Sequence, residues 1–266
     1  MKLSVFYCHV QKAALESGKS EKEVLNNLKN HGINALDVSN DDIDNSEILS
    51  LCKETGIKIA SIYDFYDWGK AEYNDCSRLL HHIDNAVLSG CPSILIVPGF
   101  LDKDTSDRMN SCENVEEFMQ SCEDIEKMTE MLRRAVSFGK EKGISVTLED
   151  FDNETSPCSR IYCLLWFFKN VDGLKFTLDT GNFLYNKENT PDAYDVLKNY
   201  TVHVHCKDRP YDRSVSCVAG EGVMSLAPVI NDLKNSGYDG YFSIEQFGLD
   251  NMEECILRSA KNLLSM

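Results

Sequence analysis

Short apolar runs alternate with longer amphipathic runs along the whole chain. The short runs are rich in β-branched residues and predict strands at residues 2–8, 33–38, 57–62, 93–98, 144–149, 174–179, 201–206 and 240–245. Between them, apolar positions at helical spacing predict helices at residues 20–31, 45–55, 71–90, 114–142, 157–170, 190–199, 225–236 and 251–264. Residues 99–113, which precede the fourth strand-to-strand helix, are expected to form a loop over the mouth of the fold.

Strict alternation of eight strands with eight helices predicts βαβ units and a parallel sheet. Eight such units that close on themselves form a (β/α)8 barrel, the TIM-barrel class of α/β fold. The main alternative, a doubly wound open sheet, requires a glycine-rich phosphate-binding turn after the first strand. The chain instead reads Cys8-His9-Val10-Gln11-Lys12 at that point. We therefore predict one (β/α)8 barrel domain over residues 1–266.

Four side chains that can bind a metal lie at the ends of the last four predicted strands: Glu149, Asp179, His205 and Glu245. In a barrel of parallel strands, the carboxyl ends meet at one face, so these groups should converge. Three carboxylates around one point repel one another unless a cation lies between them. One imidazole and three carboxylates suit a single divalent ion, and we rank Mn²⁺ first, before Mg²⁺, Co²⁺ and Zn²⁺.

Each of these residues also has an ordinary interpretation when it is taken alone. Glu149 could cap a helix, and Asp179 could cap the turn that follows it. His205 could be a hydrogen-bonded histidine at a strand end. His203 faces the same side as His205 but lies deeper, so it is expected in a lower layer or as a partner of the metal ligands. Alternation along the strand points Cys206 away from the site.

The charge and the cysteine content limit the kinds of molecule that the protein is expected to bind and the compartment in which it is expected to act. A net charge of −16 argues against binding to nucleic acid or to anionic membrane surfaces. A local basic cluster, formed by Lys207, Arg209 and Arg213, is still compatible with a small anionic substrate. No apolar stretch is long enough to span a bilayer, and the N-terminus does not resemble a signal peptide. Eleven scattered cysteines without a Cys-x-x-Cys pair indicate free thiols and a cytoplasmic protein.

Five motifs follow one another in the second half of the chain: Leu148-Glu149-Asp150, Asp179-Thr180-Gly181-Asn182, His203-Val204-His205-Cys206-Lys207-Asp208, Gly220-Glu221-Gly222 and Ile244-Glu245. With them the chain resembles the sugar phosphate isomerase/epimerase superfamily, which has a xylose-isomerase-like TIM barrel. That superfamily includes keto-sugar 3-epimerases, inosose dehydratases, hydroxypyruvate isomerases and endonuclease IV. The eight-unit pattern covers the whole chain, whereas the specific motifs begin near residue 144.

The resemblance implies that Glu149, Asp179, His205 and Glu245 are the metal ligands, and that Glu149 and Glu245 also exchange protons with the carbon beside a substrate carbonyl. A metal bound to that carbonyl and its neighbouring hydroxyl would acidify the C–H bond and stabilise an enediolate. We therefore expect an isomerase or epimerase that acts on a sugar or sugar phosphate. The alternatives are a metal-dependent dehydratase of a cyclic polyol or keto acid, similar to inosose dehydratase, and a sugar-binding barrel without catalysis.

Further residues are predicted to bind the substrate: Lys207, Asp208, Arg209, Asn182, Glu221 and His9. Glu221 could equally be a surface acid in a turn. Many relatives have a histidine where Asn182 stands; asparagine can hydrogen-bond a sugar hydroxyl but cannot shuttle a proton. The chain also lacks the extra histidines of the endonuclease relatives, which disfavours DNA repair. Relatives often form dimers or tetramers, so a homo-oligomer is an expectation that no pattern in the sequence specifies.

Overall fold

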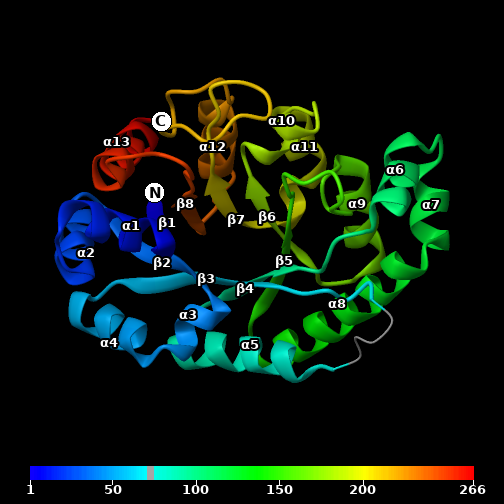
Figure 1. The fold of residues 1–266 in the computed structure, drawn as a ribbon, viewed down its shortest axis with the longest axis horizontal. Helices are drawn as coiled ribbons and strands as arrows, with labels where there is room; N and C mark the ends of the chain where they lie inside the picture. Colours follow the sequence, from blue (N-terminus) through cyan, green and yellow to red (C-terminus); the bar gives the residue numbers. More distant parts are fainter. Residues whose placement is uncertain (71–74) are drawn as a thin grey trace.

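The eight apolar runs form a closed parallel barrel in the computed structural model, which describes residues 1–70 and 75–266. Each strand pairs with the next, and β8 closes the barrel on β1, as Figure 1 shows. The strands are β1 (Lys2–Phe6), β2 (Ile33–Ser39), β3 (Lys58–Phe65), β4 (Ser93–Val97), β5 (Ser145–Glu149), β6 (Lys175–Asp179), β7 (Thr201–Cys206) and β8 (Tyr241–Ile244). The predicted (β/α)8 barrel is confirmed.

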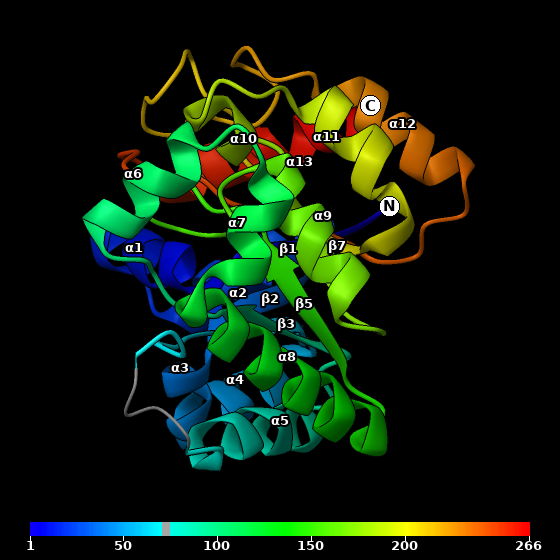
Figure 2. The same ribbon diagram turned by 90° about the vertical axis from the view of Figure 1, so that its right-hand side faces the viewer.

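The helices surround the barrel as an outer ring (Figure 1). Viewed from the side, α6 and α7 lie outside α8 and α9 (Figure 2). The helices are α1 (Tyr7–Ser17), α2 (Glu21–Asn30), α3 (Asn40–Asp44), α4 (Ser46–Thr55), α5 (Ser77–Ser89), α6 (Lys103–Ser111), α7 (Val115–Ser121), α8 (Glu123–Lys142), α9 (Ile161–Asn170), α10 (Asn182–Tyr185), α11 (Thr190–Leu197), the 3₁₀ helix η1 (Lys198–Tyr200), α12 (Leu226–Asn235) and α13 (Met252–Ser265).

Side-chain alternation in the last four strands determines how high in the barrel the four predicted metal ligands lie. The middle of the barrel interior holds small or polar side chains that are fully or nearly fully buried, such as Thr147, Thr177, His203 and Ser243. Thr177 Oγ1 donates to Thr147 Oγ1 at 2.8 Å, which ties β6 to β5 at this level. Since residues two apart in a strand face the same side, the next inward positions are the four predicted metal ligands.

Several predicted boundaries were wrong. The first strand ends at Phe6 rather than at residue 8, and α1, which the pattern did not reveal, begins directly at Tyr7. Most of the expected loop 99–113 is α6, whose first turn Asp102 caps by accepting from Thr105 N at 3.0 Å. The helix expected at 114–142 breaks into α7 and α8 where Cys122 is extended. The helix expected at 71–90 begins at Ser77, and residues 71–74 lie outside the described residues.

Two expectations from composition can be compared with the structure. All eleven cysteines lie in the described part of the chain, and none of them forms a disulfide. No helix between residues 1 and 70 or between 75 and 266 combines the length and the apolar character needed to cross a bilayer.

Candidate metal centre and cavity

The structure brings the four predicted metal ligands together at the carboxyl end of the barrel. Glu149 ends β5, Asp179 ends β6, His205 lies near the end of β7, and Glu245 directly follows β8. All four side chains are buried, and one ligand atom from each lies within 4.8 Å of those of the others. Parallel pairing explains this meeting, because Asp179 is the register partner of His205 across β6 and β7.

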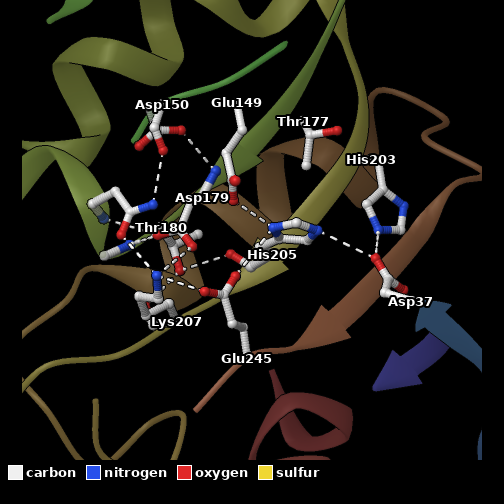
Figure 3. Close-up of polar contacts among 12 residues, drawn as sticks. Asp37, Glu149, Asp150, Thr177, Asp179, Thr180, His203, His205, Lys207 and Glu245 are labelled. Atoms are coloured by element: carbon white, nitrogen blue, oxygen red, sulfur yellow. Dashed lines mark hydrogen bonds and ion pairs between the residues drawn. The ribbon is translucent and has the colours of Figure 1, made fainter. Parts of the chain in front are cut away.

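His205 lies at the centre of the cluster (Figure 3). Its Nδ1 atom lies 2.5 Å from Glu149 Oε1 and 3.1 Å from Glu245 Oε2. On the other side of the ring, its Nε2 atom lies 3.2 Å from Asp37 Oδ2. In the view of Figure 3, Glu149 and Glu245 approach the Nδ1 side from above and below. The Nδ1 atom therefore faces the carboxylates of the candidate metal centre.

The two oxygens of Asp179 have different roles. Asp179 Oδ1 accepts hydrogen bonds from Gly181 N at 2.7 Å and from Asn182 N at 2.8 Å, so it caps the turn after β6. Asp179 Oδ2 is buried and accepts no hydrogen bond from the residues that the structure describes, although Lys207 Nζ lies 3.4 Å away. The capping interpretation and the ligand interpretation are thus compatible, because each uses a different oxygen.

Lys207 links Glu245 to the turn after β6. Its Nζ atom donates to Asn182 Oδ1 at 2.8 Å and forms an ion pair with Glu245 Oε1 at 2.6 Å. The ammonium group is buried, as expected for a side chain two residues beyond His205 that faces the same interior. Asn182 is fixed in turn, because its Nδ2 atom donates to Asp150 O at 2.7 Å.

Burial and charge act on the acids of the cluster in opposite directions. Burial raises the pKa of Glu149, and burial together with the nearby Asp179 and Glu149 charges raises the pKa of Asp150 well above its usual range. Burial also raises the pKa of Asp179. Burial would raise the pKa of Glu245 as well, but the charges and hydrogen bonds of Lys207 and His205 together outweigh it and lower that pKa.

Without a cation among them, the carboxylates of the cluster favour the charged forms of the two basic groups. Burial alone would lower the pKa of the His205 imidazole, but Glu149 and Asp37 raise it well above its usual range. The carboxylates of Asp179 and Glu245 likewise outweigh burial and raise the pKa of Lys207. The acidic cluster therefore draws positive charge toward its centre.

These residues fit a divalent metal ion. Asp179 Oδ2 and Glu245 Oε2 are buried oxygens with ion-pair neighbours but without a hydrogen-bond partner among the described residues. Together with Glu149 and His205 Nδ1, they offer three carboxylates and one imidazole nitrogen at a single point. That donor set suits a hard or borderline divalent cation, and the cation would remove the repulsion between the carboxylates.

Asp37 is a member of the site that the sequence analysis missed. It lies in β2, is fully buried, and its Oδ2 atom lies 2.6 Å from His203 Nε2 as well as 3.2 Å from His205 Nε2. Burial would raise its pKa, but His203 and His205 together lower it below the usual range. A carboxylate against the far nitrogen of a metal-binding histidine fixes the ring orientation. His203 therefore holds Asp37 from the layer below, and does not join the four groups.

A cavity of about 420 Å³ opens directly above the cluster. Its polar floor consists of Glu149, Asp152, Asn182, Lys207 and Glu245. Its walls include Leu95, Val97 and five aromatic residues that we call the aromatic belt: Phe6, Tyr63, Phe65, Phe151 and Phe247. Phe151 and Phe247 follow Glu149 and Glu245 by two residues, so alternation could have indicated both of them from the sequence.

Of the residues predicted to bind substrate, Lys207 and Asn182 line the cavity, and the other four do not. The Asp208 carboxylate accepts hydrogen bonds from backbone amides of its own loop, and Glu221 pairs with Arg258 on the surface. His9 Nε2 accepts a hydrogen bond from Gln246 N at 3.0 Å, which holds the chain beside Glu245. The positions of these residues in or beside the sequence motifs did not reveal where their side chains point.

Arg209 is buried beneath the floor of the cavity. Its Nε atom donates to Gly181 O at 2.8 Å, and its Nη2 atom donates to Asn182 Oδ1 at 3.2 Å and pairs with Asp152. Its Nη1 atom donates to Ser214 O. The guanidinium group thus anchors the loop after β7 to the turn after β6.

Comparison with known proteins identifies the family. The family model described as xylose isomerase-like TIM barrel matches residues 24–265. No curated protein sequence matches the chain significantly.

Three solved structures illustrate the similarity of fold. A D-tagatose 3-epimerase-like protein has a TM-score of 0.75 and 19% identity, with 100% of this chain and 98% of that chain covered. A probable 3-DHS dehydratase from Bacillus anthracis has a TM-score of 0.73 and 16% identity, with 100% and 99% covered. A D-psicose 3-epimerase has a TM-score of 0.71 and 15% identity, with 100% and 97% covered. With the family model spanning most of its length, this chain belongs to the xylose isomerase-like TIM barrel family.

Proposed function

We propose that the protein is a divalent-metal-dependent sugar isomerase or epimerase that moves a proton on the carbon next to a carbonyl. The observation that carries the proposal is the pair of buried glutamates, Glu149 and Glu245, which share one cluster with Asp179 and His205 and themselves line a cavity. Epimerases among the structures of similar fold agree with this assignment.

Glu149, Asp179, His205 and Glu245 would hold the metal, with Mn²⁺ as the first candidate. When bound, a divalent cation supplies positive charge that polarises a carbonyl and stabilises the negative charge that develops on the substrate oxygens. Asp37 would keep the His205 ring oriented toward the cluster through its contact with Nε2.

The two glutamates would exchange the proton. Glu149 and Glu245 both line the cavity, and they approach the cluster from above and below in Figure 3. A substrate carbon held between them could lose a proton to one carboxylate and receive a proton from the other. Lys207, at 2.6 Å from Glu245 Oε1, would hold that carboxylate in position and hydrogen-bond a substrate hydroxyl. The aromatic belt would exclude water from the reacting carbon.

A metal-dependent dehydratase is the second candidate, and the similar fold of the probable dehydratase agrees with it. The same proton abstraction would then be followed by loss of a neighbouring hydroxyl as water. A barrel that binds sugar without turnover is the third candidate. The product separates the first two, and exchange of the substrate proton with solvent separates both from the third.

The test is proton exchange in deuterated water. Mn²⁺-loaded protein is incubated with a panel of ketoses, ketose phosphates and inososes, and the C–H signals are followed by NMR. We expect one substrate class to lose a C–H signal, and Glu149→Gln and Glu245→Gln to abolish that loss. Glu221→Gln is the matched control, because Glu221 pairs with Arg258 outside the cavity.

The variants must be compared at equal metal occupancy, since both glutamates are also proposed ligands. A variant that retains the metal but loses exchange supports a role in proton transfer. Full exchange in both glutamine variants would contradict the proposal, and so would a metal-loaded protein that exchanges no proton with any member of the panel.

A further inference from the structure

Four polar side chains deep in the barrel have an oxygen atom without a hydrogen-bond partner among the described residues. The four atoms are Ser4 Oγ, Asp37 Oδ1, Ser61 Oγ and Ser243 Oγ. Each of these side chains is at most 1% exposed. A buried oxygen that loses water and gains no new partner is unfavourable, and four of them together would cost a large part of the stability of a domain. These four oxygens therefore need a further hydrogen-bond partner.

The four residues lie on adjacent strands and face the same interior. Ser243 in β8 is the register partner of Ser4 in β1, and Asp37 in β2 is the register partner of Ser61 in β3. Strand β1 joins the two pairs, because it pairs with both β8 and β2. By alternation, each serine faces the same side as the residue two positions further on, and those residues all line the cavity. Asp37 faces inward as well, because it contacts His205.

The spacing of parallel strands suits a bridge by water. Neighbouring strands lie about 4.8 Å apart, so the side chains of two register partners that point the same way are separated by a similar distance. Two oxygens that each form a hydrogen bond of about 2.8 Å to the same water molecule lie about 4.5–5.5 Å apart. One water molecule can thus join Ser4 to Ser243, and another can join Asp37 to Ser61.

The opposite half of the interior forms its hydrogen bonds directly. Thr177 Oγ1 donates to Thr147 Oγ1 at 2.8 Å, and Thr147 Oγ1 donates in turn to Ile94 O at 3.1 Å. The hydroxyl groups on β5 and β6 therefore need no bridging molecule, in contrast to those on β8, β1 and β3.

Short side chains leave volume to fill in the half formed by β8, β1, β2 and β3. The interior of a (β/α)8 barrel is usually packed with bulky branched side chains. Here the inward positions are Ser243 on β8, Ser4 on β1, Ala35 on β2 and Ser61 on β3. Protein interiors are close-packed, so other atoms must occupy the space beside these short side chains. A space lined by polar groups takes up water, which also supplies the missing hydrogen bonds.

Asp37 connects this polar region to the candidate metal centre. Its Oδ2 atom lies 2.6 Å from His203 Nε2 and 3.2 Å from His205 Nε2. In Figure 3, Asp37 lies on the side of the His205 ring that faces away from Glu149 and Glu245. Two imidazole rings thus share one oxygen of the carboxylate, and the other oxygen needs a separate donor.

From these observations we propose that the interior between β8, β1, β2 and β3 is a binding site for ordered water. About two buried water molecules bridge the Asp37 carboxylate and the hydroxyl groups of Ser4, Ser61 and Ser243, since a buried water typically makes about three hydrogen bonds to such groups. They complete the hydrogen bonds of Asp37 and so hold its carboxylate against His205. The inference does not depend on the proposed reaction, because neither a substrate nor a metal is among these contacts.

The first test is magnetic relaxation dispersion of water ¹⁷O, which counts the water molecules that stay bound for longer than the protein takes to tumble. Diamagnetic Mg²⁺ is present at the same concentration in all samples. Ser4→Val and Ser61→Val should each remove about one such water molecule, because the apolar side chain fills the space and offers no hydrogen bond. Thr177→Val is the matched control: Thr177 faces the same interior but bonds directly to Thr147, so the count should be unchanged.

A crystal structure of the unmodified protein is the second test, and it decides the question even if a valine variant does not fold. We expect density for water within hydrogen-bond distance of both Asp37 Oδ1 and Ser61 Oγ, and of both Ser4 Oγ and Ser243 Oγ. Three results would overturn the inference. They are hydroxyl groups that bond directly to each other or to backbone carbonyls without water, an ion at coordination distances of about 2.3–2.6 Å, and water counts for both serine variants equal to that of the unmodified protein.

Discussion

Replacing Asp37 with asparagine should weaken metal binding without removing any of the four proposed ligands. Asp37 Oδ2 lies 3.2 Å from His205 Nε2 and 2.6 Å from His203 Nε2, so its charge supports both rings. Carboxylate partners of metal-binding histidines typically contribute about 10–100-fold to metal affinity. The 3.2 Å contact is long for a charge-assisted hydrogen bond. We therefore expect Asp37→Asn to weaken metal binding by the lower end of this range, about tenfold, or about 1.4 kcal/mol of binding free energy.

The assay is the electron paramagnetic resonance signal of free Mn²⁺ during a titration, which reports the dissociation constant directly. Asp107→Asn is the matched control, because Asp107 is on the surface and pairs with Lys103 on the same helix. Unfolding in urea with a chelator present measures the effect on the metal-free protein separately, where loss of a charge-assisted hydrogen bond costs about 1.5–3 kcal/mol. A dissociation constant for Asp37→Asn within twofold of the unmodified protein would refute the role that we assign to Asp37.

Three further predictions concern pH, metal and loop structure. Burial lowers the pKa of His82 from 6.5 to about 4. The neutral imidazole therefore contributes stability on the order of 3 kcal/mol above pH 6.5, and this contribution is lost as the pH falls toward 4. Urea unfolding should show that His82→Gln is less destabilising at pH 5 than at pH 7.5. Mn²⁺ at about 100 times its dissociation constant should raise the free energy of unfolding by about 2.7 kcal/mol, and a chelator should reverse the rise; an unchanged value would contradict specific binding. Asp208→Ala should destabilise the protein by about 1–3 kcal/mol because it leaves loop amides without an acceptor, whereas exposed Asp250→Ala should have little effect in the same unfolding assay.

The fold and the four-residue cluster could be predicted because both depend on local patterns. An apolar run that ends in an acid is visible in the sequence, and parallel pairing brings successive strand ends together wherever a barrel closes. The inward direction of Lys207 followed from the same alternation, since it lies two residues beyond His205. Helix α1 was missed because it begins at Tyr7 without a capping side chain, directly after the apolar residues of β1.

The partners of the cluster could not be predicted, because they depend on contacts between distant parts of the chain. Asp37 meets His203 across 166 positions of sequence, and no pattern near either residue indicates that contact. Asp208 and Arg209 follow His205 closely in sequence, but their side chains are directed by the loop after β7 rather than by strand alternation. Sequence adjacency therefore suggested substrate contacts where the structure has hydrogen bonds within the loop and to neighbouring turns.

The most direct test of the account is the location of the metal itself. In a crystal of the Mn²⁺-loaded protein, the anomalous difference map should contain one strong peak at about 2.0–2.4 Å from His205 Nδ1 and from oxygens of Glu149, Asp179 and Glu245. Glu149→Gln should reduce the occupancy of that peak, and Glu221→Gln should leave it unchanged. A peak bound by other residues, or a cluster without metal at Mn²⁺ concentrations that saturate binding in solution, would contradict the account.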